Sequence, residues 1–227
     1  MLRARMKPIF IVALLLGVLL IASCNLTGGT VSDNDPCLAL EGAAKDNCFA
    51  EKLRCSQVQS LIVRDNCVAE LARKKVDLKV CDLITSDKTK GYCQEQVALI
   101  TNNQELCGDI SDQYWKDNCN SELAIKNNKD VFCSLISIPS QREDCYRTIA
   151  INTNNGQLCE FLATKEKDGC LYKIAGKIMD LKLCNDVSTP VGQDACRMKV
   201  ARVSNDKEKC KTIKISSIRE MCDSYFK

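Results

Sequence analysis

The stretch CSLISIPSQREDCYRTIA, residues 133–150, contains the pattern that the rest of the chain repeats. It has two cysteines, an aliphatic residue three positions after the first, and Ile-Ala four and five positions after the second. Spacings of three and four place side chains on one face of a helix. Pro139 favours the start of a second helix, because proline is tolerated in a first helical turn. The stretch therefore predicts a short helix, a turn and a longer helix.

The same pattern recurs about every 26 residues between Cys37 and Cys222. An aliphatic residue follows each first cysteine at position three: Leu40, Val58, Ile84, Ile110, Ile136, Leu162, Val187 and Ile213. An aliphatic-Ala pair follows most second cysteines: Leu71-Ala72, Val97-Ala98, Leu123-Ala124, Ile149-Ala150, Ile174-Ala175 and Val200-Ala201. Candidate N-caps lie four residues before a first cysteine: Asp77, Asn103, Asp180 and Asp206. A lone hairpin cannot bury its apolar face, so the repeat predicts an all-α fold, an α-solenoid of helical hairpins.

Two disulfide registers are open to the sixteen repeat cysteines. The short-spacing register joins the two cysteines of each hairpin: Cys37–Cys48, Cys55–Cys67, Cys81–Cys93, Cys107–Cys119, Cys133–Cys145, Cys159–Cys170, Cys184–Cys196 and Cys210–Cys222. The other register joins Cys67 to Cys81 and so on, and it leaves Cys37 and Cys222 at opposite ends of the array. We prefer the short spacing, in which each bridge would contribute about 3 kcal/mol in the chain-entropy model. Spacing by itself does not fix the connectivity. Cys48 and Cys55 are closer together in the sequence than other successive repeat cysteines. This spacing predicts that the longer helix of the first hairpin is shorter than its counterparts.

In sequence pattern, residues 37–222 resemble uncharacterised cysteine-repeat proteins encoded in archaeal genomes. In expected architecture, residues 37–222 are similar to disulfide-stapled helical-hairpin proteins related to tetratricopeptide repeats, whose units are longer. The resemblance implies a fold and no particular activity.

The seventeenth cysteine, Cys24, lies outside the repeat, at the end of LLIASC. Residues 1–23 have three basic residues and then an apolar run, which is the layout of a secretory signal peptide. The segment ending at Cys24 resembles the lipobox of prokaryotic lipoproteins, and this resemblance implies cleavage before Cys24 and lipidation of its thiol. The alternative is an uncleaved signal anchor with a chance cysteine. With the lipobox prediction, residues 24–36 are the lipidated cysteine and a flexible tether, and residues 37–227 are the repeat domain.

Composition excludes several kinds of function. Without residues 1–23 the chain has 29 basic and 29 acidic residues, so we expect no binding of nucleic acid. The chain has no histidine and no closely spaced cysteine pair, so we expect no enzyme activity, no metal and no cofactor. Many evenly spread cysteines in an exported chain favour disulfides.

Base-acid pairs recur just before the second cysteines: Lys45-Asp46, Arg64-Asp65, Lys116-Asp117, Arg142-Glu143, Lys167-Asp168 and Arg219-Glu220. Lys90-Gly91 and Gln193-Asp194 each lack one member. A catalytic site would occur once, so the repetition predicts an exposed ladder between neighbouring hairpins, worth about 0–1 kcal/mol per pair. Trp115, the single Trp, could anchor a partner, but we favour a role in covering a groove between repeats.

Taken together, the sequence predicts a lipid-anchored protein on the extracytoplasmic face of the cell membrane. Solenoids tend to present a concave surface to proteins or peptides, so the expected function is binding or scaffolding. The alternative is a structural cell-envelope protein without a specific ligand. A metal-binding thiol protein or an enzyme is disfavoured.

Overall fold

The computed structural model describes residues 35–227, which fall in two units, one ending at Glu41 and one spanning Gly42–Lys227. The predicted signal peptide (1–23) and the predicted lipidation site, Cys24, lie outside the described residues. In the first unit, residues 36–39 form turns. The second unit contains the repeats.

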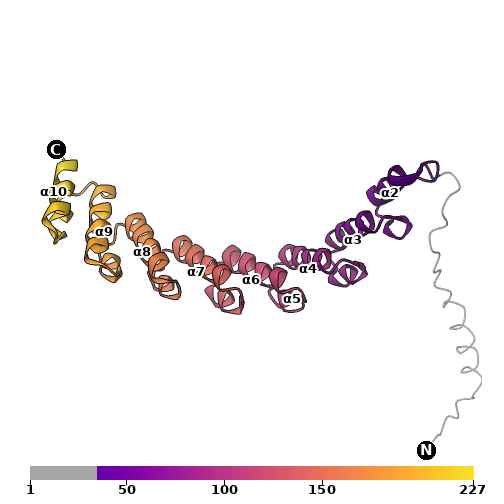
Figure 1. The fold of residues 1–227 in the computed structure, drawn as a ribbon, viewed down its shortest axis with the longest axis horizontal. Coiled ribbons are helices and arrows are strands. Elements are labelled where there is room, and N and C mark those ends of the chain that lie inside the picture. Colours follow the sequence, from indigo (N-terminus) through magenta and orange to yellow (C-terminus); the bar gives the residue numbers. More distant parts are fainter. Residues whose placement is uncertain (1–34) are drawn as a thin grey trace, which may run out of the picture. The chain divides into compact units, whose positions relative to one another are not determined.

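Long α-helices alternate with short helices throughout the second unit (Figure 1). The long helices are α2 (Gly42–Glu51), α3 (Leu61–Lys75), α4 (Asp87–Thr101), α6 (Gln113–Asn127), α7 (Pro139–Thr153), α8 (Thr164–Ile178), α9 (Pro190–Val203) and α10 (Ser216–Tyr225). The short helices are η1 (Cys55–Gln57), η2 (Leu78–Leu83), α5 (Glu105–Gly108), η3 (Asp130–Leu135), η4 (Gly156–Phe161), η5 (Lys182–Asp186) and η6 (Lys207–Thr212). Residues 35–227 contain no strand, so the all-α prediction is confirmed.

The short helices differ in kind from the expectation. Except for α5, they are 3₁₀ helices, a form that proteins use in short pieces because its hydrogen bonds are poorer. The four predicted cap residues each accept a hydrogen bond from the N–H two residues later: Asp77 from Lys79, Asn103 from Glu105, Asp180 from Lys182 and Asp206 from Glu208. The shortened first long helix is also present, since α2 has 10 residues and α3 has 15.

Each long helix packs on the long helices before and after it, so the second unit is a stack of hairpins. The predicted apolar face is its core: the repeat alanines Ala72, Ala98 and Ala124 are fully buried, and one apolar cluster runs from Ala124 to Val200. Leu40, in the first unit, departs from the pattern because it is 39% exposed. The α-solenoid prediction is therefore confirmed for Gly42–Lys227.

The disulfides of the second unit follow the short spacing. Each joins a short helix to the long helix that follows: Cys55–Cys67, Cys81–Cys93, Cys107–Cys119, Cys133–Cys145, Cys159–Cys170, Cys184–Cys196 and Cys210–Cys222. Their Cα–Cα distances lie between 5.5 and 5.9 Å, within the range of disulfides. Cys37 and Cys48 are also disulfide-bonded, and their mutual pairing stays a prediction.

Most long helices end with a residue in the left-handed region. These are Val76, Asn102, Asn128, Asn154 and Met179, with φ between 52 and 58°, and Asn205 follows α9 with φ 50°. Asn tolerates this conformation better than other non-Gly residues. The next N–H then donates to the carbonyl of the repeat alanine, for example from Asn103 to Ala98 at 3.2 Å and from Lys129 to Ala124 at 2.9 Å. This turn reverses the chain into the next short helix.

The acidic residue of the base-acid pair joins one repeat to the next. The Asp117 carboxylate, in α6, accepts hydrogen bonds from the backbone N–H groups of Ser137 (3.0 Å) and Ile138 (2.8 Å), which immediately precede α7. Four other aspartates accept from the equivalent N–H groups of the following repeat: Asp46 from Gln59 and Ser60, Asp65 from Thr85 and Ser86, Asp168 from Ser188, and Asp194 from Lys214 and Ile215. Each carboxylate thus lies at the N-terminus of the next long helix, where the helix dipole favours negative charge.

The prediction of an exposed base-acid ladder is therefore wrong in one respect. Asp117 is fully buried and Asp194 is 1% exposed, and their main partners are backbone N–H groups of the next repeat. The basic position acts within its own repeat: Arg142 donates to the Ile136 carbonyl at 2.9 Å and Gln193 to the Val187 carbonyl at 3.0 Å. Asp117 and Asp194 thus connect repeats, whereas Arg142 and Gln193 connect the two helices of one repeat.

These contacts change the acidity of the aspartates. Hydrogen bonds from the Gln59 and Ser60 N–H groups lower the pKa of Asp46. For Asp65 and Asp194, burial raises the pKa, but the backbone hydrogen bonds from the next repeat and neighbouring side-chain groups outweigh it, so the net pKa is lowered. The ionised form is therefore the one that holds the repeats together.

Candidate functional site

The junction between α4 and α6 is built differently from the aspartate junctions. Gly91 occupies the aspartate position of α4, and a Cβ at this position would lie 2.6 Å from Cδ1 of Trp115. The Trp115 ring instead packs edge-on to the rings of Tyr92 and Tyr114, with centroids 5.2 and 5.1 Å away, and against the apolar cluster around Leu123. Trp115 therefore covers the groove between two repeats, as the favoured interpretation of the sequence had it.

The same junction buries polar side chains. Glu95 is 1% exposed and accepts a hydrogen bond from the Asn118 side-chain amide. Burial raises the pKa of Glu95; the Asn118 hydrogen bond opposes this shift, and the nearby Glu122 carboxylate adds to it. Gln94 is 6% exposed, and its Oε1 has no hydrogen-bond partner among residues 35–227. The same register has apolar Val68 in the repeat before and the buried amide Asn120 in the repeat after.

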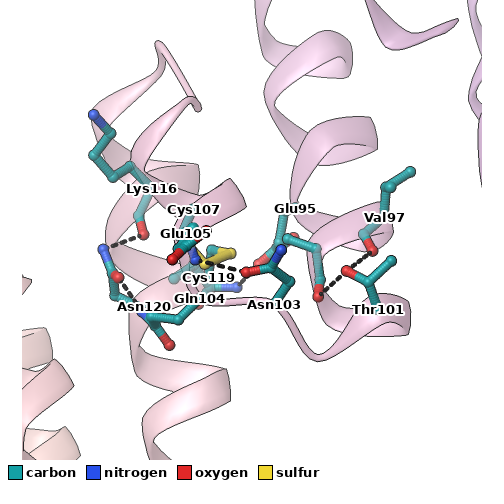
Figure 2. Close-up of a disulfide and its surroundings, with 12 residues drawn as sticks. Glu95, Val97, Thr101, Asn103, Gln104, Glu105, Cys107, Lys116, Cys119 and Asn120 are labelled. Atoms are coloured by element: carbon teal, nitrogen blue, oxygen red, sulfur yellow. Dashed lines mark hydrogen bonds between the residues drawn. A yellow bond between two sulfur atoms is a disulfide. The ribbon is translucent and has the colours of Figure 1, made fainter. Parts of the chain in front are cut away.

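A cleft of about 680 Å³ lies beside this junction, where α4, α5, α6 and η3 meet. Most of its lining is amide or charged: Asn102, Asn103, Gln104, Glu105, Lys116, Asn120, Asn127 and Lys129. The remaining lining residues are Gly108, Phe132 and Leu135. Figure 2 shows Gln104, Glu105, Lys116 and Asn120 around the Cys107–Cys119 disulfide, which fixes α5 against α6. We call this the amide cleft.

Two hydrogen bonds order the floor of the amide cleft. Asn120, 4% exposed, donates from its side-chain amide to the Lys116 carbonyl at 3.0 Å, and its Oδ1 accepts from the Gln104 side-chain amide (Figure 2). Gln104 Oε1 is shielded from solvent and has no partner in the described part of the chain. A buried acceptor without a donor is costly.

The rim of the amide cleft combines amide, charged and apolar groups. Asn102 and Asn127 exchange reciprocal side-chain hydrogen bonds of 3.3 and 3.0 Å across two repeats. The Lys129 ammonium lies 5.7 Å from the centroid of the Phe132 ring, within the range of a cation–π contact. Leu135 is 54% exposed. This set can hydrogen-bond a neutral polar chain and cover one apolar side chain.

The sequence analysis did not predict the amide cleft. The sequence feature that corresponds to the cleft is the amide-rich segment TNNQE at residues 101–105, followed by Asn120 and Asn127 in the next long helix. Amides in turns have many structural roles, so their sequence does not indicate a shared cleft. Their proximity requires the stacking of two repeats.

The remaining site predictions concern metals and membranes. Within residues 35–227, no group of three or more His, Cys, Asp or Glu side chains is arranged to hold a metal ion. In the same range, no helix combines the length and the apolar character needed to span a bilayer. No protein-family model, curated protein or solved structure matches the chain.

Proposed function

We propose that the protein is a lipid-anchored, extracytoplasmic repeat module that binds an extended peptide segment of a partner protein in the amide cleft. The observation that carries the proposal is the amide cleft itself, with five side-chain amides and an apolar wall at Phe132 and Leu135. The proposed role is non-catalytic and needs no cofactor.

The composition of the cleft matches a peptide. Each peptide group has one donor and one acceptor, and a side-chain amide has both, so Asn and Gln can pair with an extended backbone. Phe132 and Leu135 would cover one apolar side chain of the ligand. On the next repeat, Phe161 has the same register as Leu135, is 58% exposed and stacks on Tyr146 at 4.4 Å, so the apolar wall can continue along the stack.

A pair of matched variants tests the binding site. Leu135 and Leu83 occupy the same register in different repeats and are 54% and 68% exposed, so neither Leu→Asp change removes a buried side chain. In a peptide-array or peptide-display selection on the mature protein, we expect Leu135→Asp to weaken the selected peptides at least about tenfold and Leu83→Asp to leave them unchanged. Equal binding by both variants would exclude the amide cleft as the site.

The membrane anchor is proposed from the segment ending at Cys24, whose thiol would carry the lipid. The test is the intact mass of the membrane-extracted protein, before and after reduction with thiol alkylation. We expect a chain that starts at Cys24 with added lipid, and sixteen thiols that appear upon reduction. Cys24→Ser should release the folded protein from the membrane, and a variant that stays bound at the normal level would refute the anchor.

The second candidate is a structural envelope protein without a specific ligand. It is favoured by the regular construction of the stack, in which disulfides hold each repeat and aspartates hold five of the junctions. This alternative predicts that no peptide is selected and that Leu135→Asp has no phenotype.

A further inference from the structure

The first turn of α3 exposes two adjacent aliphatic side chains. Leu61 is 56% exposed and Ile62 is 76% exposed, the highest value among the large apolar side chains of residues 35–227. Exposed apolar residues are common singly, whereas an exposed pair at a helix end is a feature that needs a reason.

The other repeats show that the fold does not require this pair. The residues six and five positions before the second cysteine are Asp87-Lys88, Gln113-Tyr114, Pro139-Ser140, Thr164-Lys165, Pro190-Val191 and Ser216-Ser217 in the later repeats. Each of these pairs starts a long helix of the same kind, and none has two aliphatic residues. Leu61 and Ile62 therefore serve something outside the repeat architecture.

The α2–α3 junction presents basic side chains beside its buried carboxylates, and α2 also exposes Glu51. Hydrogen bonds from the Gln59 and Ser60 N–H groups to Asp46 bring α2 next to the start of α3. Asp46 and Asp65 are 7% and 4% exposed, so their carboxylates are withdrawn into the junctions. The basic residues beside them, Lys45 and Arg64, are half-buried and keep part of their side chains at the surface.

We propose that Leu61 and Ile62 insert into the interfacial region of the bilayer that holds the lipid of Cys24, with Lys45 and Arg64 at anionic headgroups. The proposal rests on the lipid anchor of the proposed function. From Cys24 to Gly42 the chain spans 18 residues, at most about 60 Å when fully extended. The α2–α3 end is therefore held near the membrane, while later repeats lie farther along the stack. Aliphatic side chains and basic residues together are the combination that binds interfaces.

The test places a fluorescent reporter at two positions of the same register. Ile62→Trp and Val191→Trp each replace an exposed aliphatic residue five positions before a second cysteine, and Val191 is 61% exposed. The full lipidated chains are reconstituted in anionic vesicles with or without brominated acyl chains, and the signal of Trp115 is subtracted with the parent protein. We expect brominated lipid to quench the added fluorescence of the Ile62→Trp variant at least about twofold, because the introduced indole ring would lie at the boundary between headgroups and brominated acyl chains. The added fluorescence of the Val191→Trp variant should stay unquenched.

Mass and flotation measurements on the same samples separate the two proposals. If the protein is lipidated and floats with vesicles but the Ile62→Trp reporter is not quenched, or the Val191→Trp reporter is quenched equally, the membrane-contact proposal is wrong and the anchor stands. If Cys24 has no lipid but the Ile62→Trp reporter is still quenched, the contact stands and the anchor is wrong. If there is neither lipid nor flotation, both are wrong.

Discussion

The α6–α7 and α4–α6 junctions solve the same geometric problem by different means. At α6–α7, the buried Asp117 carboxylate binds two backbone N–H groups at the start of the next helix. At α4–α6, that position is Gly91, and the ring of Trp115 fills the space. The first junction depends on charge and hydrogen bonds, and the second on packing and burial. Repeats of one architecture can therefore vary the chemistry of a junction while the disulfide within each repeat stays constant.

The largest effect is expected at the aspartate junction. Asp117→Ala removes the carboxylate that accepts from the part-buried Ser137 and Ile138 N–H groups, so we expect a loss of about 3 kcal/mol in the free energy of unfolding. The measurement is denaturant unfolding with the disulfides intact. Glu143→Ala is the matched control: Glu143 has the same register in α7, and no side-chain hydrogen bond from it to the next repeat is present within residues 35–227. A loss at Glu143 as large as at Asp117 would contradict the assigned role.

A double-mutant cycle tests the packing junction. Gly91→Ala should cost about 1–2 kcal/mol in the parent chain, because the new methyl group would overlap Trp115. In a Trp115→Ala background the overlap with the ring is gone and a tight contact with Asp112 Cβ at 3.1 Å remains, while the higher helix propensity of Ala favours α4. We expect a coupling energy of at least about 1 kcal/mol from unfolding curves of the four proteins. Additive effects would show that Gly91 and Trp115 do not depend on each other.

The smallest expected effect is a pH dependence of opposite sign at the two kinds of junction. The lowered pKa values of Asp65 and Asp194 give stability that is present above their ordinary pKa of 3.8 and is lost as pH falls through the folded value. The raised pKa of Glu95 gives stability that is present below its ordinary pKa of 4.5 and is lost as pH rises through the folded value.

Glu95→Gln separates these contributions. Gln keeps a hydrogen-bond acceptor for Asn118 and has no charge to bury, so we expect the fall in stability above pH 4.5 to become smaller in this variant. The loss of stability in acid should remain, since it comes from the aspartates. The measurement is the free energy of unfolding across the acidic and neutral pH range, and an unchanged profile above the ordinary pKa of Glu95 would refute the role of this residue.

Particular residues show how far the sequence could predict the site. The sequence shows the acid that recurs before most second cysteines and predicts its link to the neighbouring repeat, but it does not predict its burial. The reason is that Asp117 and its partner Ile138 are 21 residues apart, and a helical pattern relates residues within one face of one helix. The amide cleft was invisible for the same reason, because Asn102 and Asn127 meet across two repeats.

The sequence by itself determined the period, the all-α architecture, the apolar face and the preferred cysteine register. These follow from local spacing: cysteines 11 or 12 residues apart close one hairpin, and apolar residues three and four apart share a helix face. The tertiary structure decided which polar groups are buried at each junction and where the amide cleft opens. Those features depend on how one repeat is placed on the next, and this placement comes from side-chain packing between residues that no local pattern connects.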